Sequence, residues 1–176
     1  MLFLLVSVSL QADTTAQQKC LQVAKSFVGT KEATGHNDGK AVEMFLQSVG
    51  RHKGDSWCAA FVSYCLTKAN VKDPQVRSGL ARSFKLKKSI RARDVMLGIK
   101  NIPAGTLVIW EKGKTISGHI GFVKKWWKDS GYTVEGNTSS GQTGSQADGD
   151  GVYNRFRKIE PANYFRITSF TLVHEK

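Results

Sequence analysis

The chain has 176 residues, a length that suits one domain, and 40% of them are apolar or aromatic, which excludes a disordered chain. The 26 lysines and arginines outnumber the 14 aspartates and glutamates, so the net charge is +12 at neutral pH. This charge favours an anionic partner, and nucleic acid, anionic lipid and the acidic bacterial cell wall are all candidates.

Residues 1–12 (MLFLLVSVSLQA) form an apolar run that ends in a small residue. The run is too short to cross a bilayer, and it resembles the hydrophobic part and cleavage site of a secretory signal whose leading basic residues are missing or whose start codon is misplaced. A buried N-terminal strand is the alternative, but polar residues follow at once. We therefore expect an exported protein, periplasmic or extracellular, with one mature domain over residues 13–176. Cys20 lacks the small preceding residues of a lipoprotein site, so we expect no lipid anchor.

Two amphipathic helices are predicted in the first third of the chain. Apolar residues recur at helical spacing over residues 15–28 and again over residues 40–49. The polar segment between them, residues 31–39, carries turn signals such as Asn37-Asp38-Gly39. His36 in this segment is expected at the surface, because no cysteine or second histidine stands at the spacing of a metal site.

The segment 54–65 (GDSWCAAFVSYC) is predicted to begin a third helix, which runs to about residue 69. Asp55 and Ser56 are good N-cap residues. Cys58 then falls in the first turn, where unpaired backbone N–H groups and the positive end of the helix dipole favour a thiolate. A cysteine so placed can act as a nucleophile; the alternative is a small buried apolar residue.

Three cysteines cannot all pair with one another. Cys58 and Cys65 are seven residues apart on one predicted helix, about 10.5 Å at a rise of roughly 1.5 Å per residue. A disulfide allows only about 7 Å between Cα atoms, so this pair is excluded. A bridge between Cys20 and Cys65 is possible and would leave Cys58 free, but the sequence does not fix the pairing.

Residues 76–86 are predicted to form a more polar helix, and the basic run 85–93 (KLKKSIRAR) is expected to be a solvated face that could also contact an anion. From residue 102 the pattern changes to strands, at 106–110, 119–127, 132–137, 152–159 and 166–173. The Gly- and Ser-rich segment 138–151 is predicted to be a loop that could act as a lid. Helices followed by strands indicate an α+β fold with helices packed on an antiparallel sheet, and no membrane-spanning segment is expected.

A thiolate nucleophile needs a base and a group that orients the base. Of the four histidines, His119 begins a predicted strand beside Gly118 and Gly121, which leave room for other groups to approach the imidazole. The next strand carries Glu135 and Asn137, which the period of two places on one face. A hairpin with a bulge or shifted register would set Asn137 opposite His119. Either residue could therefore orient the imidazole.

Four motifs occur in order along the chain: SWCAAFVSYC, AGTLVIW, SGHIGFV and TVEGNT. Together they resemble the cysteine, histidine-dependent amidohydrolase/peptidase (CHAP) domain and related papain-like cell-wall hydrolases, over residues 24–157. The resemblance implies an α+β papain-like fold in which Cys58 is the nucleophile and His119 the base. Glu135 and Asn137 both match the orienting positions, and their relative weight stays open.

The resemblance implies no metal and no organic cofactor. The backbone N–H of Cys58 is one candidate oxyanion donor, and a polar side chain within residues 32–37 is a candidate for the second. Trp126 and Trp127 would face opposite sides of their strand, so we expect one of them near the surface, where it could stack on a sugar or simply be a solvated edge residue.

The function implied is that of a monomeric peptidoglycan hydrolase, a cysteine amidohydrolase or peptidase. It would cut an amide bond of the cell wall, as an N-acetylmuramoyl-L-alanine amidase or a peptide endopeptidase. Peptidoglycan is then the anionic partner, and no nucleic acid is expected. The alternatives are an antibacterial amidase delivered to competing cells and a non-catalytic wall-binding module on the same scaffold.

Overall fold

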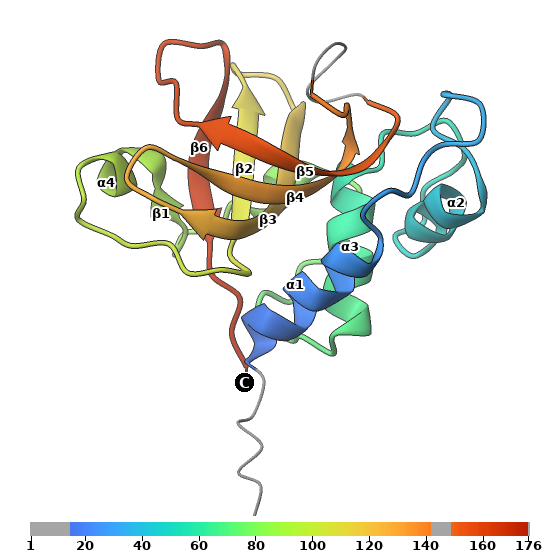
Figure 1. Ribbon diagram of the computed structural model, residues 1–176, viewed down its shortest axis with the longest axis horizontal. Helices are drawn as coiled ribbons and strands as arrows, with labels where there is room; N and C mark the ends of the chain where they lie inside the picture. The colour runs from blue at the N-terminus through green and yellow to red at the C-terminus, as the bar shows by residue number, and fades with distance from the viewer. Residues whose placement is uncertain (1–14, 142–148, 176) are drawn as a thin grey trace, which may run out of the picture.

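The computed structural model describes residues 15–141 and 149–175 (Figure 1). The predicted signal, residues 1–12, and half of the predicted lid, residues 142–148, lie outside these ranges. The described chain combines α-helices with one antiparallel sheet, which confirms the α+β fold. Its elements are α1 (Ala16–Ser26), α2 (Lys40–Gln47), α3 (Cys58–Lys68), η1 (Ala81–Phe84), β1 (Ile90–Arg91), α4 (Ala92–Met96), β2 (Leu107–Lys112), β3 (Gly118–Trp126), β4 (Ser130–Thr138), β5 (Gly151–Lys158) and β6 (Phe165–Thr171).

The three long helices confirm the helical periodicity, but only one of them begins with a side-chain cap. At α1, the Thr15 hydroxyl accepts the N–H of Gln18 and the Gln18 side chain accepts the N–H of Thr15, a capping box. The predicted N-caps of α3 are wrong, because Trp57 occupies that position without a side-chain bond. Asp55 instead accepts the N–H of His52 at 3.1 Å and stabilises the preceding turn.

The helix predicted over residues 76–86 is also wrong, since only the short 3-10 helix η1 forms there. Just before η1, side chains bond the backbone groups that a helix would pair with one another. The Ser63 hydroxyl bonds both the N–H and the carbonyl of Ser78, at 2.9 and 3.0 Å. The Arg77 guanidinium donates to the carbonyls of Val71 and Pro74. These bonds hold the backbone in a non-helical path.

The basic run 85–93 lies at the surface as expected, but part of its charge is neutralised locally. Lys85 pairs with Glu111 at 2.6 Å, and Arg91 pairs with Asp94 at 3.0 Å. The run also contains the start of α4, a short helix that the sequence pattern did not predict. Its role is therefore mainly that of a solvated face.

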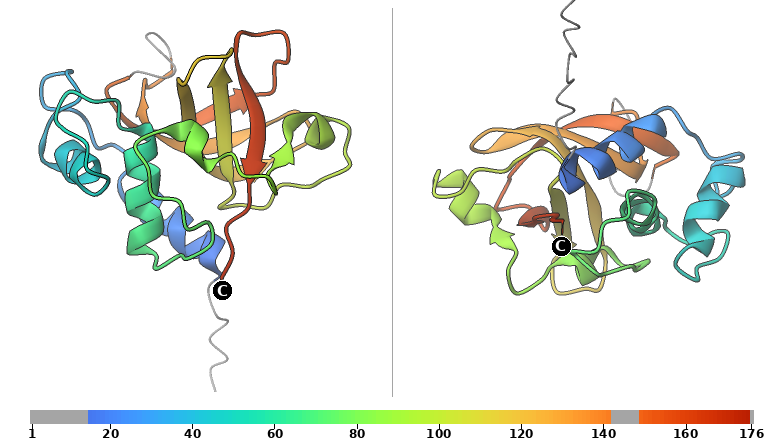
Figure 2. Two further views of the ribbon diagram at one scale, coloured as in Figure 1. Left: turned by 180° about the vertical axis from the view of Figure 1, so that it is seen from behind. Right: turned by 90° about the horizontal axis from the view of Figure 1, so that it is seen from below.

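The sheet has the strand order β1-β6-β2-β3-β4-β5, and all neighbouring strands are antiparallel. The five predicted strands are confirmed, and β1 adds a two-residue edge. Helices α1, α2 and α3 lie at one end of the sheet, and α4 lies at the other (Figures 1 and 2). No helix of the described residues is long and apolar enough to cross a membrane.

An aromatic cluster fixes α2 and α3 to one another and to the sheet. Phe45 stacks on Trp57 with ring centroids 5.8 Å apart and meets Phe61 at 5.3 Å, edge to face. Phe61 in turn meets Phe122 of β3 at 6.4 Å. All four side chains are fully buried, and buried aromatic pairs of this kind contribute about 0.5–1.5 kcal/mol each beyond their area. The N-terminus of α3 is thereby held against the sheet.

Candidate active site

Helix α3 presents Cys58 at its first position, 5% exposed. Close packing against β4 sets this position. Gly136 of β4 lies so near the helix that a Cβ there would stand 2.7 Å from the Trp57 ring and 2.9 Å from that of Phe61. Glycine in the TVEGNT motif therefore lets the strand that carries Glu135 approach the helix that carries the cysteine.

His119 and Glu135 form a buried pair, each 0% exposed. His119 Nε2 donates to Glu135 Oε2 at 2.8 Å. Gly121 permits this approach, since a Cβ at that position would lie 2.5 Å from the Glu135 Cγ. The expectation that glycines beside His119 leave space for another group is confirmed.

The second imidazole nitrogen of His119, Nδ1, is the one available to contact Cys58. Buried His119 Nδ1 has no partner within strict hydrogen-bond limits among the described residues. The Cys58 thiol is nonetheless near enough to interact with the imidazole and to raise the pKa of His119. The structure thus brings Cys58, His119 and Glu135 together, in that order of contact.

Arg157 of β5 also belongs to the site, although no sequence pattern indicates it. Its Nε donates to Glu135 Oε1 at 2.8 Å and its Nη2 donates to Oε2 at 2.5 Å, a bidentate pair. Thr133 also donates to Oε1, at 2.5 Å. The guanidinium lies 5.6 Å from the ring centroid of Trp110, which itself lies 5.2 Å from the imidazole of His119. Glu135 is therefore fixed from three directions.

Asn137 does not orient the imidazole in this structure, although it is fully buried. Its Oδ1 accepts the N–H of Trp57 at 2.9 Å, and its Nδ2 donates to Asn37 Oδ1 and to the carbonyl of Gly149, both at 3.0 Å. Of the two candidates, Glu135 is the one bonded to His119.

The divergence of Glu135 and Asn137 has a backbone cause. Asn137 has φ of +54°, in the left-handed region, and the β4–β5 register shifts between Glu135 and Thr138. The period of two therefore fails between Glu135 and Asn137. The β3–β4 bulge expected from the turn is confirmed, between Val123 and Lys125, but the pairing begins at Phe122 and does not include His119.

We expect Asn137→Ala to destabilise the fold rather than change the proton affinity of His119. The substitution leaves the buried N–H of Trp57 without its acceptor, which costs about 1–3 kcal/mol of unfolding free energy. Urea denaturation measures the loss. A shift in the pKa of His119, followed by NMR in the same variant, would contradict this assignment.

Two of the polar side chains within residues 32–37, the proposed source of a second oxyanion donor, are engaged elsewhere. Glu32 accepts the indole N–H of Trp57 at 2.8 Å and the backbone N–H of Asn37 at 3.0 Å. The Asn37 amide donates to the carbonyl of Gly54 at 3.2 Å. These bonds hold the loop 32–37 against the start of α3 and occupy both side chains.

A model of the CHAP domain family matches residues 50–137, half of the chain. That stretch contains Cys58, His119, Glu135 and Asn137. The chain belongs to the CHAP domain family. The comparisons with curated proteins and with solved structures find no match.

The charges of the CHAP site stabilise one another. Burial alone would raise the pKa of Glu135, but hydrogen bonds from Arg157 and His119 outweigh it and lower the value to about 2. Burial alone would lower the pKa of His119, but the contacts with Cys58 and Glu135 outweigh it and raise the value to about 9. At neutral pH the pair is therefore an imidazolium bound to a carboxylate.

This electrostatic balance predicts a pH-dependent stability. The pKa of His119 rises from 6.5 to about 9 on folding, so its contribution is complete below pH 6.5 and is lost as the pH rises through about 9. The pKa of Glu135 falls from 4.5 to about 2, so its contribution is present above pH 4.5 and is lost as the pH falls through about 2. Urea unfolding should show a loss of stability between pH 6.5 and 9 that His119→Gln flattens; an unchanged slope would contradict the pKa of His119.

The other two cysteines do not belong to the site. Cys20 and Cys65 are buried free thiols, so the bridge that the sequence allows between them is not formed. Burial raises the pKa of Cys20 to about 12 and the pKa of Cys65 well above its usual value. Both are therefore neutral and unreactive at physiological pH.

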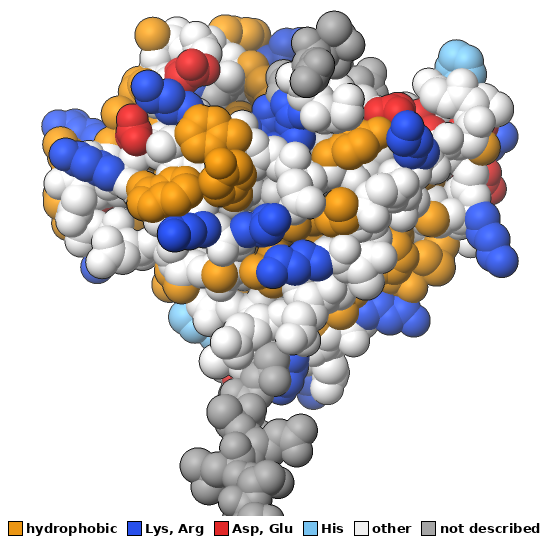
Figure 3. Space-filling model, in the orientation of Figure 1, with side chains coloured by type: hydrophobic (Ala, Val, Ile, Leu, Met, Phe, Trp, Pro, Cys, Tyr) orange, Lys and Arg blue, Asp and Glu red, His pale blue; other side chains and the backbone are white. Residues whose placement is uncertain are grey.

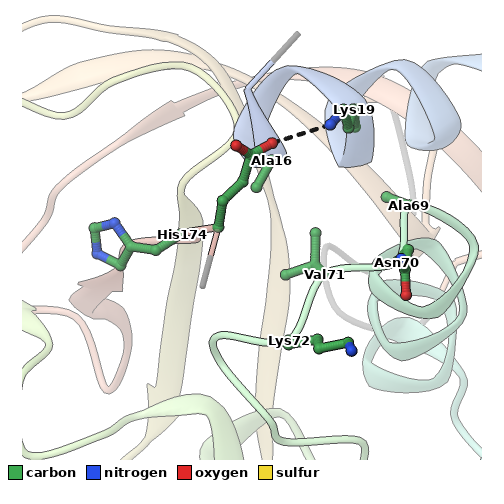
Figure 4. A pocket seen from close by; sticks show the side chains of 8 residues that line it. Ala16, Lys19, Ala69, Asn70, Val71, Lys72 and His174 are labelled. Atoms are coloured by element: carbon green, nitrogen blue, oxygen red, sulfur yellow. Dashed lines mark hydrogen bonds and ion pairs between the residues drawn. The ribbon is translucent and has the colours of Figure 1, made fainter. Parts of the chain in front are cut away.

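Two of the hollows that the described residues line lie near features already discussed. One, of about 370 Å³, is lined by Trp110 and Arg157 and so adjoins the buried pair. The other, of about 800 Å³, lies between the start of α1 and the segment after α3 (Figure 4). The ion pair between Lys19 and Glu175 crosses it at 3.0 Å, and His174 borders it. Among the described residues, no group of three or more His, Cys, Asp or Glu side chains could hold a metal ion.

Proposed function

We propose that this CHAP-family protein is an exported, monomeric peptidoglycan hydrolase in which Cys58 is the nucleophile. The observation that carries the proposal is the chain of contacts from Cys58 through His119 to Glu135, at the N-terminus of a helix. A thiolate, a base and a carboxylate in this order form the machinery of cysteine hydrolases. The net charge of +12 suits an anionic polymer as substrate.

The first step forms an acyl-enzyme. The Cys58 thiolate attacks the carbonyl carbon of an amide, and the negative charge that develops on the oxygen is stabilised by the N–H of Cys58 and the helix dipole. The His119 imidazolium then donates its proton to the leaving amine as the C–N bond breaks. A pKa of about 9 keeps that proton available at neutral pH.

The second step releases the product. The imidazole, now neutral, removes a proton from water, and the hydroxide attacks the thioester and frees a carboxylate and the thiolate. Glu135 holds the Nε2 proton throughout, so that Nδ1 remains the nitrogen that exchanges protons. Arg157 keeps Glu135 ionised and in place and is a positioning residue.

The energetics oppose the alternative of a non-catalytic wall-binding module. Burying Glu135 and His119 as charged groups costs free energy that the fold must recover from their mutual contacts. A pure binder gains nothing from this arrangement beside a cysteine. An antibacterial amidase would use the same chemistry, so that alternative concerns the target cell and not the reaction.

Digestion of purified peptidoglycan by the reduced protein tests the proposal. Mass spectrometry of the released fragments should show new pairs of amino and carboxyl ends. Free stem peptides with an intact first alanine would identify an amidase, and new ends within the peptide would identify an endopeptidase. Protein alkylated with iodoacetamide should release nothing. Absence of fragments from folded, reduced protein would refute the proposed function.

A further inference from the structure

Three aromatic side chains form an exposed row across the ends of β3, β4 and β5. Trp127, Tyr132 and Phe156 are 45%, 47% and 56% exposed. The Trp127 and Tyr132 ring centroids are 5.7 Å apart, and those of Tyr132 and Phe156 are 5.4 Å apart. Figure 3 shows hydrophobic side chains gathered over the ends of β4 and β5, with basic side chains beside them. Neighbouring large aromatic rings left this exposed mark a binding surface.

The β-bulge in β3 brings lysines to the same side of the sheet. Tyr132 pairs with Lys125 on one strand and with Phe156 on the other, so these three side chains share a face. The bulge makes Lys124 the extra residue, and its Nζ donates to Asn154 Oδ1 at 2.7 Å. Asn154 lies two residues before Phe156 and therefore on that face too. Without the bulge, two consecutive lysines would point to opposite sides.

The charge of this surface is mainly positive. Lys125 Nζ lies 5.2 Å from the centroid of the Trp127 ring. Lys158 follows Phe156 by two residues on β5 and lies 3.9 Å from Asp129, a long and exposed ion pair. Such a pair contributes little, so Lys158 remains able to contact another anion. We call these lysines and rings the aromatic–lysine face, which comprises Lys124, Lys125, Trp127, Tyr132, Phe156 and Lys158.

Alternation along β5 puts Phe156 and Lys158 on one side of the sheet and Arg157, the partner of Glu135, on the other, so the aromatic row and the candidate active site lie on opposite sides of the sheet. β5 is the edge strand of the sheet; residues 29–32 bond its beginning, at Asp150 and Val152, so a ligand would have to pass around its other end, near Phe156 and Lys158. Phe156 and Lys158 also line the hollow of about 370 Å³ that Trp110 and Arg157 border. Arg157 binds Glu135, the partner of His119. A polymer on the face can therefore extend towards the site in which the reaction is proposed.

We propose that the aromatic–lysine face binds a glycan strand of the cell wall. The C–H faces of successive sugar rings would stack on Trp127, Tyr132 and Phe156, and the lysines would contact the carboxylates that the polymer carries. A neutral apolar partner would not explain the lysines, and a purely anionic one would not explain the row of rings. The identity of the polymer rests on the proposed function, but the binding does not depend on catalysis.

The test measures binding of Cys58→Ala protein to purified, insoluble peptidoglycan by co-sedimentation. Adding Trp127→Ala and Tyr132→Ala should weaken binding about tenfold or more, and Lys124→Ala with Lys125→Ala should reduce both the affinity and its dependence on salt. Ile116→Ala is the matched control, because this side chain is 77% exposed and lies elsewhere. Protein that carries both Cys58→Ala and Ile116→Ala should bind peptidoglycan with the same affinity as Cys58→Ala protein. Thermal unfolding establishes that all variants are folded.

The same variants on an active background separate this proposal from the proposed function. Loss of the two rings should slow digestion of insoluble peptidoglycan and leave cleavage of a short soluble wall fragment unchanged. Unweakened co-sedimentation of the double aromatic variant would overturn the inference even if hydrolysis is confirmed. The inference is also overturned if Cys58→Ala does not sediment with peptidoglycan, or if the loss of rings acts only by dissociating a dimer in sedimentation velocity. If the double aromatic variant loses binding to phosphatidylglycerol vesicles as strongly as it loses binding to peptidoglycan, the face would be assigned to a membrane instead.

Discussion

Replacing Cys58 by alanine is expected to abolish peptidoglycan hydrolysis, with a loss on the order of 10⁴-fold or more. The variant lacks the proposed nucleophile, so the remaining imidazole and carboxylate would have no thiolate to activate. The side chain is small and 5% exposed, and the fold should tolerate its truncation. The rate of fragment release from peptidoglycan measures the effect.

Cys20→Ala is the matched control for this experiment. Cys20 is also a buried cysteine, but its thiol bonds the backbone carbonyl of Gln17 at 3.4 Å and contacts neither His119 nor Glu135. We expect this variant to lose some stability and to retain the hydrolytic rate of the wild type. Wild-type activity in Cys58→Ala, or equal losses in both variants, would show that Cys58 is not the nucleophile.

Removing the Glu135 carboxylate is expected to damage both stability and activity. Glu135→Ala deletes the acceptor of two Arg157 bonds and one His119 bond in a fully buried site, which should cost about 3–5 kcal/mol of unfolding free energy. The imidazole also loses the group that fixes its tautomer, so the rate should fall on the order of 10²–10⁴-fold in whatever protein remains folded.

Glu135→Gln separates the two effects. Glutamine preserves the shape, but its amide nitrogen cannot accept the bonds that both Arg157 and His119 donate to the carboxylate. We expect a smaller loss of stability than in Glu135→Ala and a rate reduced on the order of 10²-fold or more. The pKa of His119, measured by NMR, should fall in Glu135→Gln and stay near 9 in Asn137→Ala. The opposite pattern would make Asn137 the orienting residue.

The sequence patterns identify those parts of the structure that depend on local spacing. Helices α1, α2 and α3 follow from apolar periodicity, and the five longer strands follow from short apolar or alternating runs. The position of Cys58 at a helix start also follows locally. The helix predicted over residues 76–86 fails because bonds from Ser63 and Arg77, which no periodicity encodes, replace its backbone ladder.

The site itself depends on contacts between segments far apart in the chain. Glu135 and Asn137 look equivalent in the sequence, and the left-handed backbone at Asn137 separates their side chains. Arg157 reaches Glu135 only because β5 pairs with β4 in a register that places Tyr153 opposite Glu135. A hairpin with a short turn would have made that register predictable, but the segment between these strands is too long to fix it.

Intact-mass analysis of acid-quenched protein during turnover of a wall fragment tests whether Cys58 is the nucleophile. We expect a covalent adduct with the mass of the acyl half of the fragment, located on the peptide that contains Cys58 and absent from Cys58→Ala. Buried, neutral Cys20 and Cys65 should carry none. Continued release of fragments without an adduct, and equally fast in Cys58→Ala, would contradict a thiol mechanism for this protein.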